Sequence, residues 1–389
     1  MRTQVVIVGG GPSGLLLGQH LTRAGIDNIV LERRSRAYVL ARIRAGVLER
    51  GTVDQMRDLG LGARMDAEGY VHSGTIITFN NEQIRIDFEE HAGTSVVVYG
   101  QTELTKDLYE ARDSDGTVIL HEVEDVAISD ADTDAPFVTF TQAGRAQRID
   151  CDYIAGCDGF RGVSRQTIPA SVRREYEKVY PFGWLGILSE TKPLHHELIY
   201  ANSDAGFALS SMRNEQLSRY YVQCAADDDP AAWSDDAFWD ALRRRLPAEY
   251  AEAMETGPSI EKSIAQLRSF VCEPMQWGRL FLCGDAAHIV PPTGAKGLNT
   301  AASDIYYLAD ALIRHYVHHD PTGIAGYSGR ALARVWKAER FSWWMTSLLH
   351  RFPHQSDFDS KMQMAEVAML KQNAAAQAVL AQNYVGLPY

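Results

Sequence analysis

At the start of the chain, two short apolar runs flank a glycine-rich turn and an amphipathic stretch. Residues 4–9 are rich in β-branched side chains, which favours a buried strand. Leucines then recur at helical spacing from Leu15 to Leu21, and Gly25 is placed to end that helix. A second strand is expected at 29–31. This order of strand, helix and strand predicts a parallel sheet with a right-handed crossover.

At about residue 70 the pattern changes to short segments in which apolar and polar side chains alternate. Segments 75–79, 84–86 and 95–99 show this alternation, which is typical of strands in a sheet with one face in water. A helix is expected near 101–112. Further strands are expected at 117–128, 136–140 and 153–156. The last of these is apolar, so we expect the chain to return there to the parallel sheet.

The second half predicts a separate β lobe and a helical end. Residues 180–225 and 258–271 alternate, with a helical segment at 233–255 between them, and 280–283 form another apolar strand. From about residue 299 the pattern is helical. We therefore predict an α/β fold with a Rossmann-like first lobe, an interleaved, mainly antiparallel α+β second lobe and a helical C-terminal region. The expected bounds are 1–70, 97–179 and 272–340 for the first lobe, 71–96 and 180–271 for the second, and 341–389 for the C-terminal region.

Composition adds limits to this picture. A chain of 389 residues exceeds what one hydrophobic core usually organises, which agrees with two packed lobes. No stretch approaches the roughly 20 apolar residues that span a bilayer, and the N-terminus enters a strand rather than a signal peptide. A net charge of −12 disfavours nucleic acid and anionic membrane surfaces as partners. We therefore expect a cytoplasmic protein that binds neither.

The five cysteines are scattered and include no CxxC pair, so we expect reduced core residues and no metal site. They are Cys151, Cys157, Cys224, Cys272 and Cys283. Against the acidic background, any anionic ligand must meet a local basic patch. Two such patches are Arg33, Arg34, Arg36, Arg42 and Arg44, and the pair Arg213 and Arg219. Without neighbouring motifs, a solvated surface would be the simpler interpretation of both.

The segment Gly9–Gly14 fits the pattern GxGxxG directly after a strand and at the start of a helix. Glycines there allow a tight turn and close approach of the backbone to a pyrophosphate, and the helix N-terminus favours negative charge. Glu32 ends the second strand, where a carboxylate can accept hydrogen bonds from a ribose. Alone the glycine pattern is weak. In this context it predicts a dinucleotide site without distinguishing FAD from NAD.

Two further motifs follow predicted strands, at 157–161 (Cys-Asp-Gly-Phe-Arg) and 284–288 (Gly-Asp-Ala-Ala-His). An Asp-Gly pair alone is usually a turn. A carboxylate such as Asp285, just before a helix, can accept bonds from ribityl hydroxyls, and backbone N–H groups near 294–299 can face a flavin ring or a phosphate.

With these three motifs the chain resembles the class A flavoprotein monooxygenases. Segments 42–49, 180–184, 284–299 and 383–388 extend the resemblance over essentially the whole chain, to the branch that hydroxylates 4-hydroxybenzoate. The resemblance implies FAD, O2 and NADPH, with NADH as the alternative, and 3,4-dihydroxybenzoate formed through a flavin C4a-hydroperoxide. It also implies a homodimer.

The resemblance further implies roles for particular residues. Ser211, Arg213 and Tyr221 would hold the substrate carboxylate, to which a planar guanidinium is matched. Tyr200 would take the proton of the phenol and pass it to Tyr384, with His72 connecting to solvent. Pro292 would place its carbonyl near the phenol, and Thr293 would help to position the ring and flavin. FAD would contact Gly9, Gly11, Ser13, Gly14, Glu32, Arg42, Arg44, Gln101, Asp158, Asp285, Leu298 and Asn299. The nicotinamide cofactor would contact Arg33, Arg34, Tyr38, Arg44, Asp158 and Arg268.

Several alternatives stay open from the sequence. Tyr200 and Tyr221, considered alone, are more often core or sheet-surface aromatics, and an isolated arginine such as Arg213 is more often solvated. Other aromatic acids, such as 3-hydroxybenzoate or 4-aminobenzoate, are alternative substrates. A non-catalytic FAD-binding sensor and a nicotinamide dehydrogenase are the alternatives of other classes. Two arginines at 33 and 34 would suit a 2′-phosphate, which favours NADPH.

Overall fold

Buried apolar strands build a six-stranded sheet at the N-terminal end of the molecule, which we call the first lobe. The computed structural model describes residues 1–42 and 46–389. All residues of the two central strands are buried, as is typical of a parallel sheet that is covered on both faces. The strand order is β18 (Gln276–Trp277), β19 (Leu280–Leu282), β12 (Tyr153–Gly156), β1 (Val5–Val8), β2 (Asn28–Glu32) and β8 (Val118–His121). All neighbours are parallel except β18 and β19, so the expected parallel sheet is confirmed.

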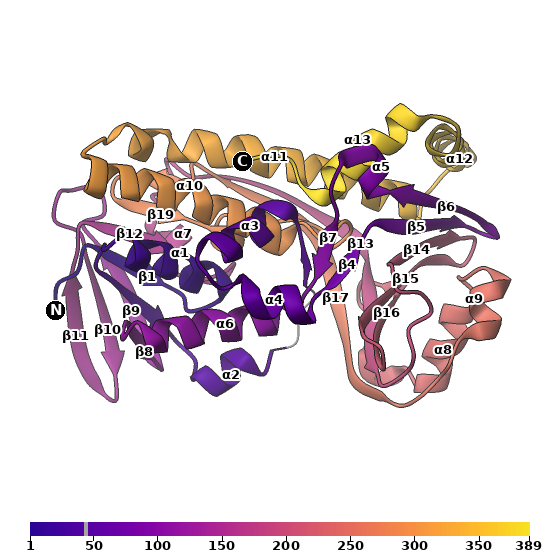
Figure 1. Ribbon diagram of the computed structural model, residues 1–389, viewed down its shortest axis with the longest axis horizontal. Helices are drawn as coiled ribbons and strands as arrows, with labels where there is room; N and C mark the ends of the chain where they lie inside the picture. Colours follow the sequence, from indigo (N-terminus) through magenta and orange to yellow (C-terminus); the bar gives the residue numbers. More distant parts are fainter. Residues whose placement is uncertain (43–45) are drawn as a thin grey trace.

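Long helices surround this sheet (Figure 1). The predicted crossover helix is α1 (Pro12–Arg23), which packs against α6 (Gln101–Ser114) and α10 (Gly297–His318). Helix α11 (Thr322–Leu349) packs on α10 and runs along the molecule from the first lobe towards the second (Figure 1). A small antiparallel sheet at the outer end contains β9 (Val123–Ser129), β10 (Phe137–Gln142) and β11 (Arg145–Asp150). Short helices complete this lobe: α2 (Arg36–Leu40), α3 (Arg50–Asp58), α4 (Gly62–Glu68) and α7 (Ser164–Thr167).

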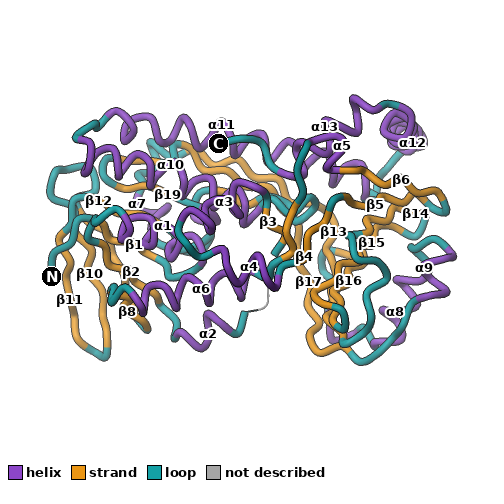
Figure 2. Tube along the Cα trace, in the orientation of Figure 1, coloured by secondary structure: helices purple, strands orange, loops and turns teal. Residues whose placement is uncertain are grey.

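An eight-stranded sheet forms the second lobe. Its order is β20 (His288–Ile289), β17 (Ser259–Glu273), β13 (Arg174–Ser189), β16 (Leu217–Ala225), β15 (Gly206–Asn214), β14 (Ile199–Ser203), β5 (Gly74–Phe79) and β6 (Glu82–Asp87). Only β14 and β5 pair in parallel, so the mainly antiparallel prediction is confirmed for this sheet. Beside it lie η1 (Pro230–Ala232), α8 (Asp235–Arg243) and α9 (Ala248–Ala253) (Figure 2).

The two lobes are joined by elements that belong to both. Strands β13 and β17 are 16 and 15 residues long and pair along most of their length. The lobe boundaries expected at 179/180 and 271/272 fall inside these two strands. They stay a prediction. A third connection is the small sheet β3 (Val47–Leu48), β7 (Val96–Val98) and β4 (Tyr70–His72). The chain ends in α12 (Asp357–Gln372) and α13 (Ala374–Val385), and α13 packs on α5 (Phe88–Ala92).

Some expected elements differ in detail from the structure. The strand expected at 117–128 is two strands, because Glu122 between β8 and β9 has a positive φ of 58°. The helical segment expected at 233–255 is broken into α8 and α9, since Pro247 precedes α9 and cannot continue a helix. Between β2 and β3, the short helix α2 begins at Arg36, after Ser35 caps it by accepting a bond from the Tyr38 N–H. Within the residues described, no helix has the length and apolar character needed to cross a membrane.

Candidate active site

The glycine turn between β1 and α1 combines close packing with one open position. Gly9 has φ of +112°, and a Cβ added there would lie 2.2 Å from the Cys157 carbonyl oxygen. A Cβ on Gly14 would lie 1.9 Å from the Gly9 carbonyl oxygen. By contrast, a Cβ on Gly11 would meet no atom within 4 Å. The backbone at Gly11, the N-cap of α1, therefore borders open space where a phosphate can approach the helix N-terminus.

Glu32 lies at the end of β2 and organises that edge of the sheet. Its Oε2 accepts a hydrogen bond from the Gly10 N–H at 2.8 Å, and its Oε1 accepts one from the Arg34 N–H at 2.7 Å. The side chain is buried. Each carboxylate oxygen can accept a further bond, so the geometry leaves capacity for a ribose hydroxyl.

Two aspartates lie where β12 and β19 end, at the same edge of the parallel sheet. Asp158 Oδ2 accepts bonds from the Ser164 N–H and Oγ, both at 2.9 Å. Its Oδ1 is buried and has no partner among the residues described, and burial raises the pKa of this carboxyl group. Asp285, in η2 (Gly284–Ala286), is exposed. Ligands bind at the carboxyl ends of strands in open α/β sheets, so both carboxyl groups lie where a dinucleotide is expected.

The start of α10 offers backbone donors instead of a side chain. The Asn299 amide nitrogen donates to the Val47 and Ala295 carbonyls, and its oxygen accepts from the Glu49 N–H and the Thr52 hydroxyl. The amide is thus fully used in joining β3 and α3 to α10. The first N–H groups of α10, at 297–299, have no acceptor among the described residues, as is usual at a helix N-terminus. Any contact of Asn299 or Leu298 with flavin is therefore expected through the backbone.

Neighbouring strands of the second lobe bring the candidate substrate residues onto one face of the sheet. Tyr200 on β14 and Tyr221 on β16 both lie directly opposite Leu209 of β15. Ser211 follows Leu209 at an interval of two, so it shares the face of Leu209. Arg213 lies where the pairing of β15 with β16 is irregular, between Met212 and Asn214, and its guanidinium is close enough to Tyr221 for the tyrosine to raise its pKa. Tyr200, Ser211 and Tyr221 therefore line one side of the sheet, with Arg213 beside Tyr221. The opposite side packs on α8, where the rings of Tyr220 and Trp239 lie 5.2 Å apart.

Arg213 is a half-buried cation with no ion-pair partner among the described residues. Its Nε and Nη1 are shielded from solvent and find no acceptor within the described part of the chain. Burial lowers the pKa of the guanidinium, and the nearby Arg219 acts in the same direction, while Tyr221 and Glu261 oppose it. Arg219 differs because it pairs with Glu261 at 3.0 Å. A buried charge is costly unless it is paired, so Arg213 is suited to an anionic ligand.

Two tyrosine hydroxyl groups meet on the same side of the sheet. The Tyr200 and Tyr384 hydroxyl oxygens are 2.9 Å apart, and both side chains are 1% exposed. Burial raises the pKa of Tyr200 to about 12 and raises that of Tyr384 well above its ordinary value. Both hydroxyls are neutral near pH 7, so each can accept one proton and release another. The pair is 184 residues apart in sequence and is made by the docking of α13 on the second lobe.

His72, the third predicted member of this route, is buried at the end of β4. Neither ring nitrogen has a hydrogen-bond partner among the described residues. Burial lowers the pKa of His72 to about 4. The Tyr384 ring stacks on Phe88 at 4.8 Å, and the Phe88 N–H donates to the carbonyl of Ser73, the neighbour of His72. Phe88 and Ser73 thus link the histidine segment to the Tyr384 ring, and His72 makes no hydrogen bond to either tyrosine among the described residues.

The loop before α10 faces this pair. The Thr293 and Thr346 hydroxyl groups are 3.0 Å apart, which fixes the loop to α11. Gly294 has φ of +93°, and its backbone lies close enough to the Tyr200 hydroxyl to lower the pKa of that group slightly against the larger effect of burial. The Pro292 carbonyl accepts from the Ala295 N–H at 3.0 Å. The loop thus connects the nucleotide edge of the first lobe with the tyrosines of the second.

Comparison with known proteins gives independent findings. A family model described as FAD binding domain matches residues 2–342. The p-hydroxybenzoate hydroxylase of Acinetobacter baylyi is 54% identical over 390 residues, which cover 100% of this chain and 96% of that protein. The chain belongs to the p-hydroxybenzoate hydroxylase family. This confirms the family predicted from the three motifs together with the resemblance of the four further segments, and the chain is an FAD-dependent enzyme.

More distant proteins share the fold of this hydroxylase. A para-nitrophenol 4-monooxygenase of a Pseudomonas species is 25% identical, over 79% of this chain and 77% of that protein. The crystal structure of a p-nitrophenol 4-monooxygenase from Pseudomonas putida superposes with a TM-score of 0.83 at 18% identity, over 100% of both chains. The predicted mixed α/β fold class is confirmed.

The residues of the hydroxylase fit FAD on three observations. Open space borders Gly11, Asp158 Oδ1 is buried without a partner within the described ranges, and Asp285 is exposed at the same edge of the sheet. Ser13 lies in the first turn of α1 and Gln101 is the first residue of α6. The predicted contact Arg44 lies outside the described residues. Arg42 is exposed, and its carbonyl accepts from the Thr102 hydroxyl at 2.9 Å.

The residues predicted to hold the nicotinamide cofactor lie on the surface of the hydroxylase and are not all gathered at one point. Arg33, Arg34 and Tyr38 are exposed at the end of β2, with the Arg34 guanidinium 5.0 Å from the centre of the Tyr38 ring. Arg268 lies on β17, where it pairs with Glu177 at 3.2 Å and lies over the Phe160 ring. Arg268 is therefore near the Asp158 segment, and Arg33 and Arg34 lie beside Glu32.

Sequence reasoning missed a buried ionic cluster in this hydroxylase. Lys296 Nζ donates to Glu49 Oε1 at 2.6 Å and to the Tyr384 carbonyl at 2.9 Å. Arg334 donates to Glu49 Oε2 at 2.9 Å and to the Leu387 carbonyl. The signal available was two charged residues, Glu49 and Lys296, inside segments that carry the family resemblance, while Arg334 lies outside those segments. The cluster fixes the C-terminal end, and with it Tyr384, against the first lobe.

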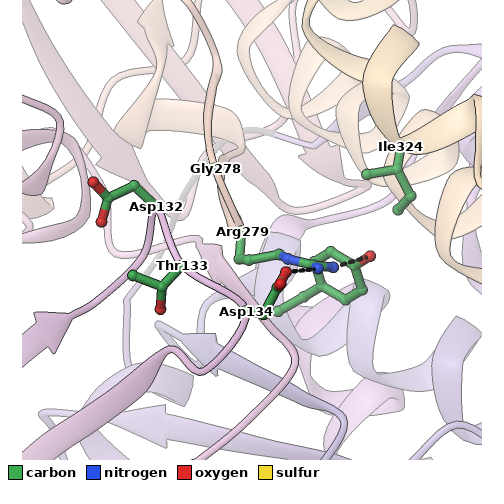
Figure 3. A pocket seen from close by; sticks show the side chains of 7 residues that line it. Asp132, Thr133, Asp134, Gly278, Arg279 and Ile324 are labelled. Carbon is green, nitrogen blue, oxygen red and sulfur yellow. Dashed lines mark hydrogen bonds and ion pairs between the residues drawn. The ribbon is translucent and has the colours of Figure 1, made fainter.

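A surface cavity of about 250 Å³ lies away from this site, at the outer end of the first lobe (Figure 3). Arg279 there is satisfied, since it donates to the Tyr153 hydroxyl at 2.6 Å and pairs with Asp134. The predicted site residues do not line it. Its lining residues are Asp132, Thr133, Asp134, Tyr153, Gly278, Arg279 and Ile324.

Proposed function

We propose that this enzyme hydroxylates 4-hydroxybenzoate at position 3, to give 3,4-dihydroxybenzoate, with FAD, NADPH and O2. The observation that carries the proposal is Arg213, whose shielded Nε and Nη1 have no acceptor among the described residues, on the same sheet as Tyr200 with its hydroxyl contact to Tyr384. A para-substituted phenolic acid has an anion at one end and an ionisable hydroxyl at the other. Its two ends match the two features. The relative from Acinetobacter baylyi supports the same substrate by its name.

The carboxylate end is held by the strand β15 and its neighbour. Arg213 offers a planar fork of N–H donors that can bind both oxygens of a carboxylate, with the Ser211 and Tyr221 hydroxyls beside it. Ser211 Oγ has only a weak bond, at 3.3 Å to the Met212 carbonyl. Binding an anion also neutralises a buried charge, so the carboxylate contributes affinity where a neutral phenol does not.

At the phenol end, the protein must help to remove a proton. A phenol has a pKa of about 10, like tyrosine, and is neutral in water at pH 7. Tyr200 can accept the substrate proton as it passes its own to Tyr384, so no charge is left between them. Loss of the proton makes the ring carbon beside the oxygen electron-rich enough to attack an electrophile. The Pro292 carbonyl is proposed to orient the phenol.

FAD is proposed to lie along the edge formed by Gly11, Glu32, Asp158 and Asp285, with its ring towards the N–H groups at the start of α10. When bound and reduced by the nicotinamide cofactor, FAD supplies an electrophilic oxygen atom derived from O2. The protein residues bind and orient the two reactants. Burial of Tyr200 and Tyr384 keeps bulk water away from the reacting carbon.

NADPH is proposed as the preferred reductant because Arg33 and Arg34 are exposed beside the β2 terminus. Two cations there suit the extra 2′-phosphate of NADPH. The ratio of kcat/KM for NADPH and NADH tests this preference. A ratio near one, or a higher value with NADH, contradicts the assignment.

Purified enzyme with FAD provides the main test. Consumption of NADPH should accelerate with 4-hydroxybenzoate and yield 3,4-dihydroxybenzoate in nearly equal amount. Three comparison substrates each change one feature: 3-hydroxybenzoate moves the hydroxyl to the meta position, 4-aminobenzoate replaces it by an amine, and plain phenol lacks the carboxylate. The proposal fails if another acid is hydroxylated with a higher kcat/KM, or if no dihydroxy product forms.

We also propose that the enzyme works in the cytoplasm as a homodimer. Two tryptophans on α11, Trp336 and Trp343, support the dimer together with the resemblance, since their side chains are 41% and 47% exposed. Large exposed aromatic side chains are enriched at protein interfaces. Light scattering of the eluted protein should give twice the monomer mass of 43.2 kDa. A monomeric mass at all accessible concentrations contradicts the proposal.

A further inference from the structure

Three histidine rings lie together between β4 and the segment that precedes β14. The His72 and His196 ring centres are 6.1 Å apart with the planes at 79°, and the His195 and His196 ring centres are 4.5 Å apart. The three differ in exposure. His72 is 1% exposed, His195 is half-buried, and the His196 side chain is 65% exposed. A path of imidazole rings thus leads from the interior to water.

Hydrogen bonds give the two surface histidines different roles. His195 Nδ1 accepts the Glu197 N–H at 3.0 Å, so this ring is used in holding its own loop. His196 Nε2 lies 3.8 Å from Glu197 Oε1, beyond hydrogen-bond distance. Both nitrogens of His72 lack a protein partner in the described ranges. His196 and His72 are therefore the two rings with nitrogens available for proton exchange.

The charged groups around His72 form a defined set. Glu197 is buried and binds Arg85 through both carboxylate oxygens, at 2.7 and 2.9 Å, while Arg85 also contacts Asp87. Nearby, Ser73 donates to Glu89 at 3.1 Å. Burial is the main cause that lowers the pKa of His72, His196 and His195 add to the lowering, and Glu197 opposes it. A neutral His72 can accept a proton on one nitrogen and release one from the other.

We propose that His196 carries the substrate proton between His72 and bulk solvent. This inference rests on the proposed function, because it extends the proton route that begins at the substrate phenol. The phenol proton goes to Tyr200, the Tyr200 proton to Tyr384, and a proton passes on to His72 and then His196, which releases it to a base in solution. Each step breaks one O–H or N–H bond and forms another, so no other reactant is required.

His196→Gln in the FAD-loaded enzyme tests the inference. After a jump from about pH 6.5 to about pH 8.5, the ultraviolet absorbance of bound 4-hydroxybenzoate reports the change from phenol to phenolate. Since acid–base groups commonly contribute about 100-fold or more, loss of this exit is expected to slow the change at least about tenfold. The final fraction of phenolate should stay the same, because a relay changes a rate and not an equilibrium. Added imidazole should restore the rate.

A matched control is His195→Asn, whose side-chain oxygen can still accept the Glu197 N–H. Its deprotonation rate is expected to stay within about twofold of that of the wild type, and His72→Gln should be slow like His196→Gln. An unchanged rate in His196→Gln, equal slowing in both surface variants, or slowing that imidazole does not relieve overturns the inference. If the wild type itself forms no 3,4-dihydroxybenzoate, the proposed function has failed, and that result is separate from the behaviour of the variants.

Discussion

At the scale of single residues, chemistry in this protein is decided by which polar groups are buried with a partner and which without. Asn299 has all of its amide contacts filled by protein, whereas Arg213 and one oxygen of Asp158 have none among the described residues. Burial without a partner is unfavourable, so such groups are retained where a ligand completes them. This distinction separates structural from ligand-binding roles among residues of the same family motifs.

Tyr200→Phe should uncouple oxygen consumption from hydroxylation. Removing the hydroxyl breaks the 2.9 Å contact with Tyr384 and leaves the substrate phenol without its proton acceptor. We expect product formed per NADPH to fall at least about tenfold while hydrogen peroxide accumulates. Product and peroxide are measured together. Tyr220→Phe is the control, because the neighbouring Tyr220 is equally buried but faces α8; equal product yields in the two variants contradict the role of Tyr200.

At the scale of elements, the turn between β1 and α1 leaves space for a ligand, and helix α11 holds the C-terminal end in place. The turn has two glycines that must stay glycine because backbone oxygens lie about where a Cβ would be, and one, Gly11, that borders open space. Helix α11 contributes Arg334 to hold the C-terminal end and Thr346 to hold the loop before α10.

Gly11→Ala is expected to fold and to bind FAD more weakly. The new methyl meets no protein atom, but it occupies the space through which a pyrophosphate would approach the backbone. The Kd for FAD should rise about tenfold or more, which corresponds to about 1.4 kcal/mol. Titration of apoprotein by flavin fluorescence measures it. Gly329→Ala on α11, which also meets nothing, should leave the Kd unchanged; an unchanged Kd in Gly11→Ala would place the pyrophosphate elsewhere.

Arg334→Met should loosen the C-terminal end. The substitution removes buried bonds to Glu49 and to the Leu387 and Pro388 carbonyls, while Lys296 still neutralises Glu49. Breaking a buried ion pair costs about 3 kcal/mol. Urea denaturation measures the loss, and proteolysis of the last residues reports the loosening. Arg330→Met, one turn away and 41% exposed in its pair with Asp310, should cost less than about 1 kcal/mol. Similar losses of unfolding free energy in the two variants would contradict the role of Arg334 in holding the C-terminal end.

At the scale of the whole molecule, the long strands β13 and β17 join the two lobes, and a few ionisable side chains are buried between packed elements. His350 stacks between Phe182 and Phe207 and accepts the Trp184 indole N–H at 2.7 Å. Burial lowers the pKa of His350 to about 3. Burial raises the pKa of the Glu339 carboxyl group to about 7. The two pKa shifts have opposite directions, but in both side chains burial favours the neutral form.

These shifts set the pH dependence of stability. His350 is neutral when folded but takes up a proton below about pH 6.5 when unfolded, so its contribution is complete above that pH and is lost as pH falls towards 3. For Glu339 the unfolded carboxyl ionises first, so stability falls as pH rises from about 4.3 to about 7.

His350→Gln therefore should flatten the acid side of the stability profile. Between about pH 7.5 and about pH 5.5, wild type should lose about 1 kcal/mol more free energy of unfolding than the variant does, since the unfolded chain alone protonates there. Glutamine keeps an acceptor for Trp184, and urea denaturation at both pH values gives the difference. His354→Gln, at an exposed position, should keep the wild-type slope. Parallel slopes for wild type and His350→Gln would assign the acid sensitivity to other groups.

The sequence by itself determined the parts that depend on near neighbours in the chain. The strand, glycine turn and helix at 5–23, the alternating strands of the second lobe and the three motifs are contiguous, and their conformations follow from local spacing and glycine positions. Together they predicted the fold class, and the resemblance of further segments predicted the family. Boundaries such as Glu122 and Pro247 were less clear, because one residue with an unusual φ can divide an apolar run.

Only the tertiary structure decided which groups meet and which are left without a partner. The Tyr200 and Tyr384 contact, the Lys296 and Arg334 bonds to Glu49, and the approach of His196 to His72 join segments from different elements. Pairing and burial depend on how distant segments pack, and spacing along the chain carries no record of that packing. The resemblance could name Tyr200, Arg213 and His72. The packing shows why a neutral hydroxyl, an unpaired cation and a buried imidazole occur at these positions.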